Sequence, residues 1–108
     1  MSVFGDGGTS KSATQAASTR YQRVISGVVD GTEVIPAGAW VSEISVQAST
    51  LSDATVDVTP DGRAAWDTLT IKAGTSYTIA IDTKDHLEGA EIVFVGIDSY
   101  AIVISEAA

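Results

Sequence analysis

From about residue 21 onward, apolar and polar side chains alternate along much of the chain. In segment 40–48, one face carries Trp40, Ile44, Val46 and Ala48. A period of two is typical of a β-strand with one buried face. Segments 55–59 and 76–82 repeat the pattern, and the second places Tyr77, Ile79 and Ile81 on one face. The pattern therefore predicts half-buried strands, with Trp40 packed in the core.

Turn signals divide the chain into short segments. Asp30-Gly31, Pro36-Ala37-Gly38 and the stretch Thr59–Arg63 combine the residues that preset or permit turn geometry. The expected strands are 23–29, 33–35, 40–48, 55–59, 68–72, 76–82, 91–97 and 100–105. About eight short strands predict an all-β domain of antiparallel strands, as a β-sandwich, a jelly roll or a small barrel. The sequence does not separate a jelly roll from an immunoglobulin-like sandwich.

Two similar stretches mark equivalent corners of this domain. VIPAGAWV (34–41) and TIKAGTSY (70–77) share Ile-x-Ala-Gly, and each joins the end of one predicted strand to the start of the next. Gly38 and Gly74 are expected to adopt positive φ or to provide room for a tight corner.

The end of the chain lacks alternation. Segments 92–95 and 101–104 are continuously apolar, and they are expected to form a hairpin about Asp98-Ser99. A strand that is apolar on both faces has to be covered on both faces. The outer cover is either another part of the chain or a second subunit. The second alternative assigns four residues to a self-association surface: Ile92, Phe94, Ile102 and Ile104.

The first twenty residues differ from the rest. Segment 5–19 is rich in Gly, Ser, Thr and Ala and has no sustained apolar pattern, so residues 1–20 are predicted to form an extended N-terminal arm before a β-sandwich domain at 21–108. Residues 1–23 carry a formal charge of +2 and residues 24–108 one of −10. The arm either docks on an acidic partner or is a disordered end. The candidate docking residues are Phe4, Lys11, Arg20, Tyr21 and Arg23.

Composition supports the fold and narrows the function. Val and Ile together number 22 against 3 Leu, and β-branched residues favour strands. The absence of cysteine excludes disulfides and thiolate metal sites. No basic segment followed by an apolar run suggests a signal peptide, and no run is long enough to span a membrane. The acidic domain disfavours nucleic acid and anionic membranes as partners.

Candidate catalytic chemistry is sparse. His86 is the only histidine and lies in a polar loop, where Asp82, Asp85, Glu88 and Glu91 offer oxygen ligands for calcium. The segment 57–62 resembles the start of an EF-hand loop, but Pro60 and the missing twelfth-position Glu favour a simple turn. We therefore expect no catalytic, cofactor-binding or metal-binding residues, and predict that the protein is not an enzyme. A small hydrolase remains a third alternative.

Aromatic side chains raise a different possibility. Trp40, Trp66 and Tyr77 are the types of residue that stack on sugars. Because Trp40 is expected in the core, a carbohydrate-binding or adhesive module would use Trp66 and the loop around His86. This is the alternative function.

The chain as a whole resembles the head-decoration and head-fibre proteins of tailed bacteriophages. The resemblance rests on the arm at 2–19, on the Ile-Pro-Ala-Gly and Ile-Lys-Ala-Gly corners, and on the Val/Ile-rich end at 92–104. It implies a non-enzymatic virion protein, a homotrimer whose arm contacts the major capsid protein. Collar or tail positions are also consistent with the same features.

Overall fold

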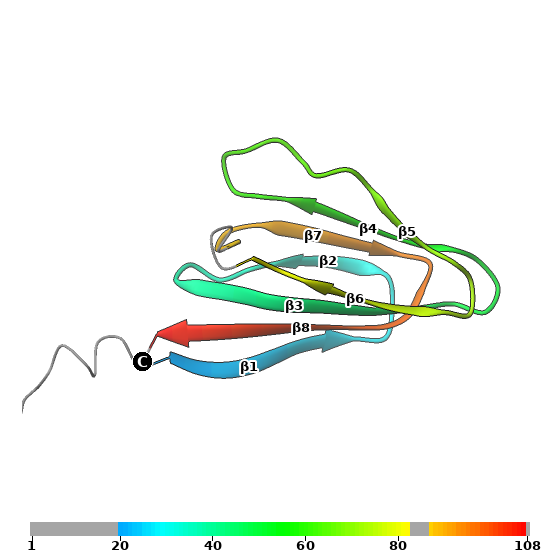
Figure 1. Ribbon diagram of the computed structural model, residues 1–108, viewed down its shortest axis with the longest axis horizontal. Coiled ribbons are helices and arrows are strands. Elements are labelled where there is room, and N and C mark those ends of the chain that lie inside the picture. The colour runs from blue at the N-terminus through cyan, green and yellow to red at the C-terminus, as the bar shows by residue number, and fades with distance from the viewer. Residues whose placement is uncertain (1–19, 83–86, 108) are drawn as a thin grey trace, which may run out of the picture.

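The computed structural model describes residues 20–82 and 87–107, which form eight strands. The strands are β1 (Arg20–Gly27), β2 (Gly31–Val34), β3 (Ala39–Ala48), β4 (Ala54–Thr59), β5 (Leu69–Ile71), β6 (Ser76–Ala80), β7 (Glu91–Val95) and β8 (Ile97–Ala107). Sheet A has the order β1-β8-β3-β6 and sheet B the order β2-β7-β4-β5 (Figure 1). The two antiparallel sheets pack face to face, which confirms the predicted all-β sandwich.

The strand pairing identifies the sandwich as a jelly roll. β1 pairs with β8, β2 with β7, β3 with β6 and β4 with β5, so the chain pairs as one long nested hairpin. Additional pairing of β3 with β8 and of β4 with β7 rolls this hairpin into two sheets. This nested order is that of a jelly roll and not of an immunoglobulin-like sandwich, which distributes its strands differently.

The two Ala-Gly stretches form equivalent corners, as predicted. The N–H of Ala39 donates to the C=O of Pro36 (3.1 Å), and the N–H of Thr75 donates to the C=O of Lys72 (3.0 Å). The glycines in these two turns have φ of 80° and 75°, which requires glycine at the third turn position. Each corner carries the chain from sheet B to sheet A, between β2 and β3 and between β5 and β6.

The predicted C-terminal hairpin is wrong. β7 lies between β2 and β4 in sheet B, whereas β8 lies between β1 and β3 in sheet A. Gly96, at φ 75°, joins them by crossing from one sheet to the other, and Asp98 and Ser99 belong to β8. Both strands are central in their sheets, so their side chains alternate between the core and the outer faces.

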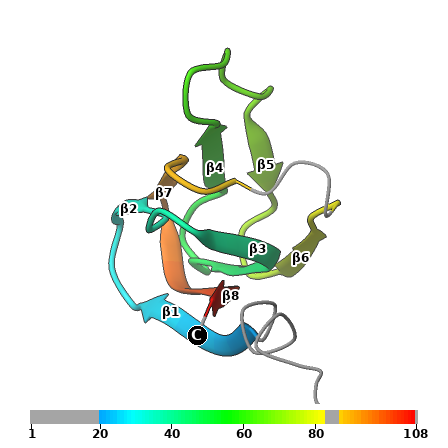
Figure 2. The same ribbon diagram turned by 90° about the vertical axis from the view of Figure 1, so that its left-hand side faces the viewer.

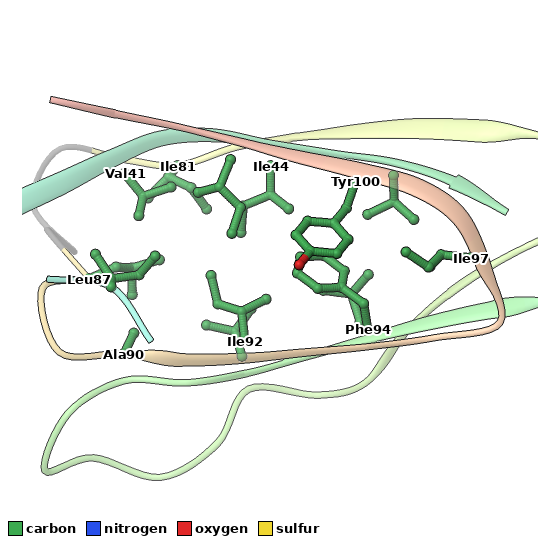
Figure 3. Close-up of a cluster of buried hydrophobic side chains, with 14 of the residues drawn as sticks. Val41, Ile44, Ile81, Leu87, Ala90, Ile92, Phe94, Ile97 and Tyr100 are labelled. Atoms are coloured by element: carbon green, nitrogen blue, oxygen red, sulfur yellow. The ribbon is translucent and has the colours of Figure 1, made fainter. Parts of the chain in front are cut away.

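The four residues assigned to self-association lie in the core. Ile92, Phe94, Ile102 and Ile104 are each 0% exposed and point between the two sheets; Figure 3 shows the first two. Side chains enclosed by their own domain do not reach a second subunit, so this assignment is corrected. The apolar residues between them along the strands, such as Val93 and Val103, lie on the outer faces and account for the missing alternation.

Trp40 is also placed differently from the prediction. The pairing of β3 with β8 shifts register between Val41 and Glu43, which marks a β-bulge at Ser42. A bulge adds one residue to a strand and reverses the faces beyond it. Val41 is therefore buried, and Trp40 is 37% exposed on the outer face of sheet A.

Tyr100 links the two sheets inside the sandwich. Its ring stacks on Phe94 with centroids 4.0 Å apart, and its hydroxyl donates a hydrogen bond to the carboxylate of Glu33 on β2. The ring lies where a side chain at Gly27 would begin, because a Cβ there would be 2.6 Å from the Tyr100 ring atoms. Position 27 therefore has to be glycine for the Tyr100 ring to pack against the β1 backbone.

The Tyr100 hydroxyl is expected to make folding sensitive to alkali. The hydrogen bond to Glu33, together with burial and the Glu33 charge, raises the pKa of Tyr100 to about 12. Unfolded tyrosine ionises near pH 10, so the folded state retains the proton more strongly. The stabilisation is complete below about pH 10 and is lost as the pH rises toward about 12.

Urea unfolding of the wild type and of Tyr100→Phe between pH 8 and pH 12 measures this effect. The variant is expected to lose less stability than the wild type above pH 10. Tyr21 and Tyr77 are exposed and are present in both proteins, so they cancel in the difference. Identical pH dependence in the two proteins would contradict the assignment.

Candidate interaction surface

The residues considered for catalysis and metal binding do not form a site in the described part of the chain. His86 and Asp85 lie outside the described residues. Among the described residues, no three His, Cys, Asp or Glu side chains gather as metal ligands. Asp57 on β4 accepts a hydrogen bond from the Thr68 hydroxyl. The described residues include no helix with the length and apolar character of a membrane span.

Trp66, the residue proposed to stack on sugars, is partly buried against the core. Its backbone N–H donates to the C=O of Val58 at 2.8 Å, which ties the segment after the turn at Pro60 to β4. Trp66 thus packs partly against its own domain, which leaves less of its ring available for stacking on a sugar.

Three of the five candidate docking residues lie on β1, and Phe4 and Lys11 lie outside the described residues. Arg20 donates to the C=O of Gly38 (2.7 Å) and of Ser105 (2.8 Å), and to the Ser105 hydroxyl (3.2 Å). Its guanidinium also lies 3.9 Å from the centre of the Trp40 ring, a cation–π contact. Arg20 thus fixes the beginning of β1 against β3 and β8, and most of its donors are already used.

Arg23 is paired within the chain as well. Its Nε lies 2.8 Å from Glu106 Oε1, and a second nitrogen lies 3.2 Å from Oε2, so the contact is bidentate. The pKa of Arg23 is raised and that of Glu106 is lowered, in both cases chiefly by their mutual hydrogen bond. Tyr21, between the two arginines, is exposed.

The outer face of sheet A extends across four strands and includes the three longest strands of the sandwich. Cross-strand pairing defines its outward residues as Arg20, Gln22, Val24 and Ser26 on β1, Ser99, Ala101, Val103 and Ser105 on β8, Trp40, Glu43, Ser45 and Gln47 on β3, and Ser76, Thr78 and Ala80 on β6. Arg20 and Glu43 are the charged residues of this set and have opposite signs, although the chain contains 14 acidic residues. We call this set the neutral face.

The neutral face is hollowed at its centre. A shallow depression of about 590 Å³ is lined by seven of its outward residues, Ser26, Ser45, Gln47, Ser76, Thr78, Ser99 and Ala101, and also by Gly27, Val28, Val46, Tyr77 and Tyr100. The depression arises because four adjacent strands carry small side chains there. The lining includes Tyr77, which is 53% exposed, and Tyr100, but no carboxylate, imidazole or amine that would serve general acid–base catalysis near neutral pH.

This surface was not predicted from the sequence. Its signal was present as Ser, Thr, Gln and Ala at the polar positions of the alternating segments. The pattern acquires meaning only when β1, β8, β3 and β6 are placed side by side, and these strands are far apart along the chain.

The chain is similar to known proteins in structure but not detectably in sequence. No family model and no curated protein matches the sequence. The tobacco streak virus coat protein, solved as a dimer, is similar with a TM-score of 0.44 and 14% identity, over 81% of this chain and 86% of that chain. A second crystal form of that coat protein gives a TM-score of 0.39 at 16% identity, over 81% and 88% of the two chains.

A protein of Bacillus endospore appendages, described as disulfide-linked pili, is similar with a TM-score of 0.41 and 11% identity, over 81% of this chain and 90% of that chain. The present chain has no cysteine. All three TM-scores are below 0.5.

Proposed function

We propose that this protein is a non-enzymatic structural subunit of a virion and assembles with further copies of itself. The observation that supports this most is the neutral face, which carries a single acidic side chain in a chain of net charge −8. Copies of a strongly acidic protein repel one another unless their contact surfaces are free of that charge. A face on which most side chains are small and uncharged meets this condition.

In the more specific form of the proposal, the subunit decorates the head of a tailed bacteriophage. Residues 1–20 contact the major capsid protein, and the jelly roll projects outward. This rests on the sequence resemblance and on the contrast between the basic first 23 residues and the acidic remainder. The trimer implied by that resemblance remains a prediction, because the side chains first assigned to its interface lie in the core.

Docking through residues 1–20 is tested by comparing the full chain with a chain lacking residues 1–19. Both are mixed with capsid shells assembled without the protein and are sedimented. The full chain is expected to sediment with the shells and the shortened chain to remain in solution. Retaining Arg20 in the shortened chain preserves its contacts with Gly38 and Ser105. Equal sedimentation of the two chains would refute this docking route.

Self-assembly predicts a solution mass above that of one chain. We expect light scattering of the full chain to give two or three times 11.1 kDa, and dilution to lower this mass. Raising the salt concentration tests the charge argument, because screening weakens repulsion between the acidic parts of neighbouring copies and favours assembly. A mass of one chain at all concentrations and salt levels would rule out assembly by the protein alone.

A further inference from the structure

The four edge strands of the sandwich are not equally protected. β2 has 4 residues, β5 has 3 and β6 has 5, whereas β1 has 8. Short edges are one way in which proteins prevent unwanted strand pairing; prolines, lysines and bulges are others. β1 contains none of these, and its pairing with β8 runs without a register shift from Arg20 opposite Ala107 to Gly27 opposite Tyr100.

The second edge of β1 is open in the described structure. β1 borders sheet A, with β8 on one side and no described strand on the other (Figures 1 and 2). In an antiparallel strand, alternate residues direct their N–H and C=O groups away from the existing neighbour. A regular strand of this length therefore offers a row of unpaired backbone groups to a further strand.

The two charges on β1 do not oppose such pairing. Arg20 is held by Gly38, Ser105 and Trp40, and Arg23 is held by Glu106. The remaining residues from position 21 to position 27 are uncharged. The edge is thus locally neutral, and it continues the neutral face through the outward side chains of Gln22, Val24 and Ser26.

We propose that β1 pairs with β1 of a second copy, antiparallel and about a twofold axis, so that two A sheets join into one. This inference rests on the proposed self-assembly and names its contact. A twofold axis requires residues of like orientation to face each other, because a shift of one residue would place the core side of one strand opposite the outer side of the other. For two β1 strands that overlap over most of their 8 residues, the twofold axis passes through a residue at the middle of the strand, which is Arg23 or Val24.

Charge selects between these two centres. Centring on Arg23 places two guanidinium groups directly opposite each other, which is unfavourable. Centring on Val24 places Val24 against its own copy, a side chain that is 56% exposed in the single chain. Gln22 then faces Ser26 of the second copy.

The same register places the exposed Tyr21 opposite Gly27 of the second copy. Gly27 has no side chain of its own, and the Tyr100 ring occupies the space beside it. Gly27 is therefore covered on this side by its own chain, and a Tyr21 ring of the second copy would lie beside the Tyr100 ring. This register brings Tyr21 and Tyr100 of opposite copies together twice per dimer.

Single cysteines test the contact directly, because the natural chain has none. Val24→Cys in the full chain is expected to form a covalent dimer with a short bis-maleimide cross-linker, since opposed Cβ atoms lie about 4.5–5.5 Å apart. Val34→Cys is the matched control: Val34 is 61% exposed and lies on β2, an edge of sheet B. The proposal is overturned if Val24→Cys is cross-linked no faster than Val34→Cys.

A mixed experiment checks the register. Gln22→Cys and Ser26→Cys, each carrying a different tag, are expected to cross-link to each other faster than either does to itself. Preferential cross-linking of Gln22→Cys to itself would instead centre the pairing on position 22 and contradict the proposed register.

Val24→Glu separates this proposal from the proposed function. It places two like charges opposite each other on an exposed position, and about a fivefold or greater rise in the dimer dissociation constant is expected. Val34→Glu adds the same charge elsewhere and is expected to change little. If Val24→Glu assembles like the wild type, the β1 contact is refuted while self-assembly stands. A wild type that remains monomeric refutes both.

Discussion

Gly96→Ala is expected to destabilise the domain more than any other alanine substitution at a glycine. The residue has φ 75°, where a side chain costs about 1–2 kcal/mol. A Cβ at this position would also lie 2.4 Å from the carbonyl oxygen of Asp53, a backbone atom that has no rotamer through which to move away. The chain crosses between the sheets here, and the Gly96 C=O accepts a hydrogen bond from the Ser49 N–H at 2.9 Å.

The expected loss is about 3–5 kcal/mol, because strain at a special φ and overpacking act together. For a domain of this size, about 4–8 °C of melting temperature is lost per kcal/mol, so a fall of more than about 12 °C is expected in a calorimetric scan. The connection between β3 and β4 would have to move to accept the methyl group.

Gly74→Ala is the matched control for this substitution. Gly74 has the same φ of 75°, but a Cβ there would meet nothing within 4 Å. It is therefore expected to lose only the conformational cost, about 1–2 kcal/mol. If the two variants melt at the same temperature, the close contact with Asp53 does not contribute and the tight corner at Gly96 is wrongly described.

Phe94→Ala is expected to produce the second large effect. Phe94 is fully buried and stacks on Tyr100 with an interplanar angle of 7°. Truncating a buried phenylalanine typically costs about 3–5 kcal/mol, from the lost apolar burial and from the cavity that remains. Chemical unfolding of the variant should show the midpoint displaced to much lower denaturant, with a nearly unchanged slope.

The neighbouring residue provides the control. Val95 lies on the same strand but points outward and is 49% exposed, so Val95→Ala is expected to change the stability by no more than about 0.5 kcal/mol. This pair distinguishes a core role from an interface role. If Phe94→Ala lowers the oligomeric mass while leaving the stability of the single chain unaffected, Phe94 belongs to an interface after all.

Two separate features of the surface support assembly. The neutral face has no net charge at its paired positions, since Arg20 offsets Glu43, and β1 provides an edge without a described neighbour at the margin of that face. Pairing through β1 would double the width of the sheet and make the face continuous across the twofold axis. The acidic residues elsewhere, including Asp57 and Glu91 in sheet B, would leave the opposite side charged and soluble.

Local patterns in the sequence determined much of the fold. A period of two identified the strands, because side chains alternate across any strand whatever its neighbours. The Ala-Gly corners were predicted for a similarly local reason, since the third position of such a turn needs positive φ. The abundance of Val and Ile over Leu indicated the all-β class, because β-branched residues suit pleated surfaces.

Only the tertiary structure decided which strands are neighbours. β7 and β8 are separated by Gly96 alone and still belong to different sheets, because a glycine corner permits a crossing as readily as a hairpin. Trp40 faces outward because the bulge at Ser42 adapts β3 to its register with β8, a partner far away in sequence. Pairing depends on backbone hydrogen bonds and packing between distant segments, so the neutral face and the open edge of β1 appear only after the sheets have formed.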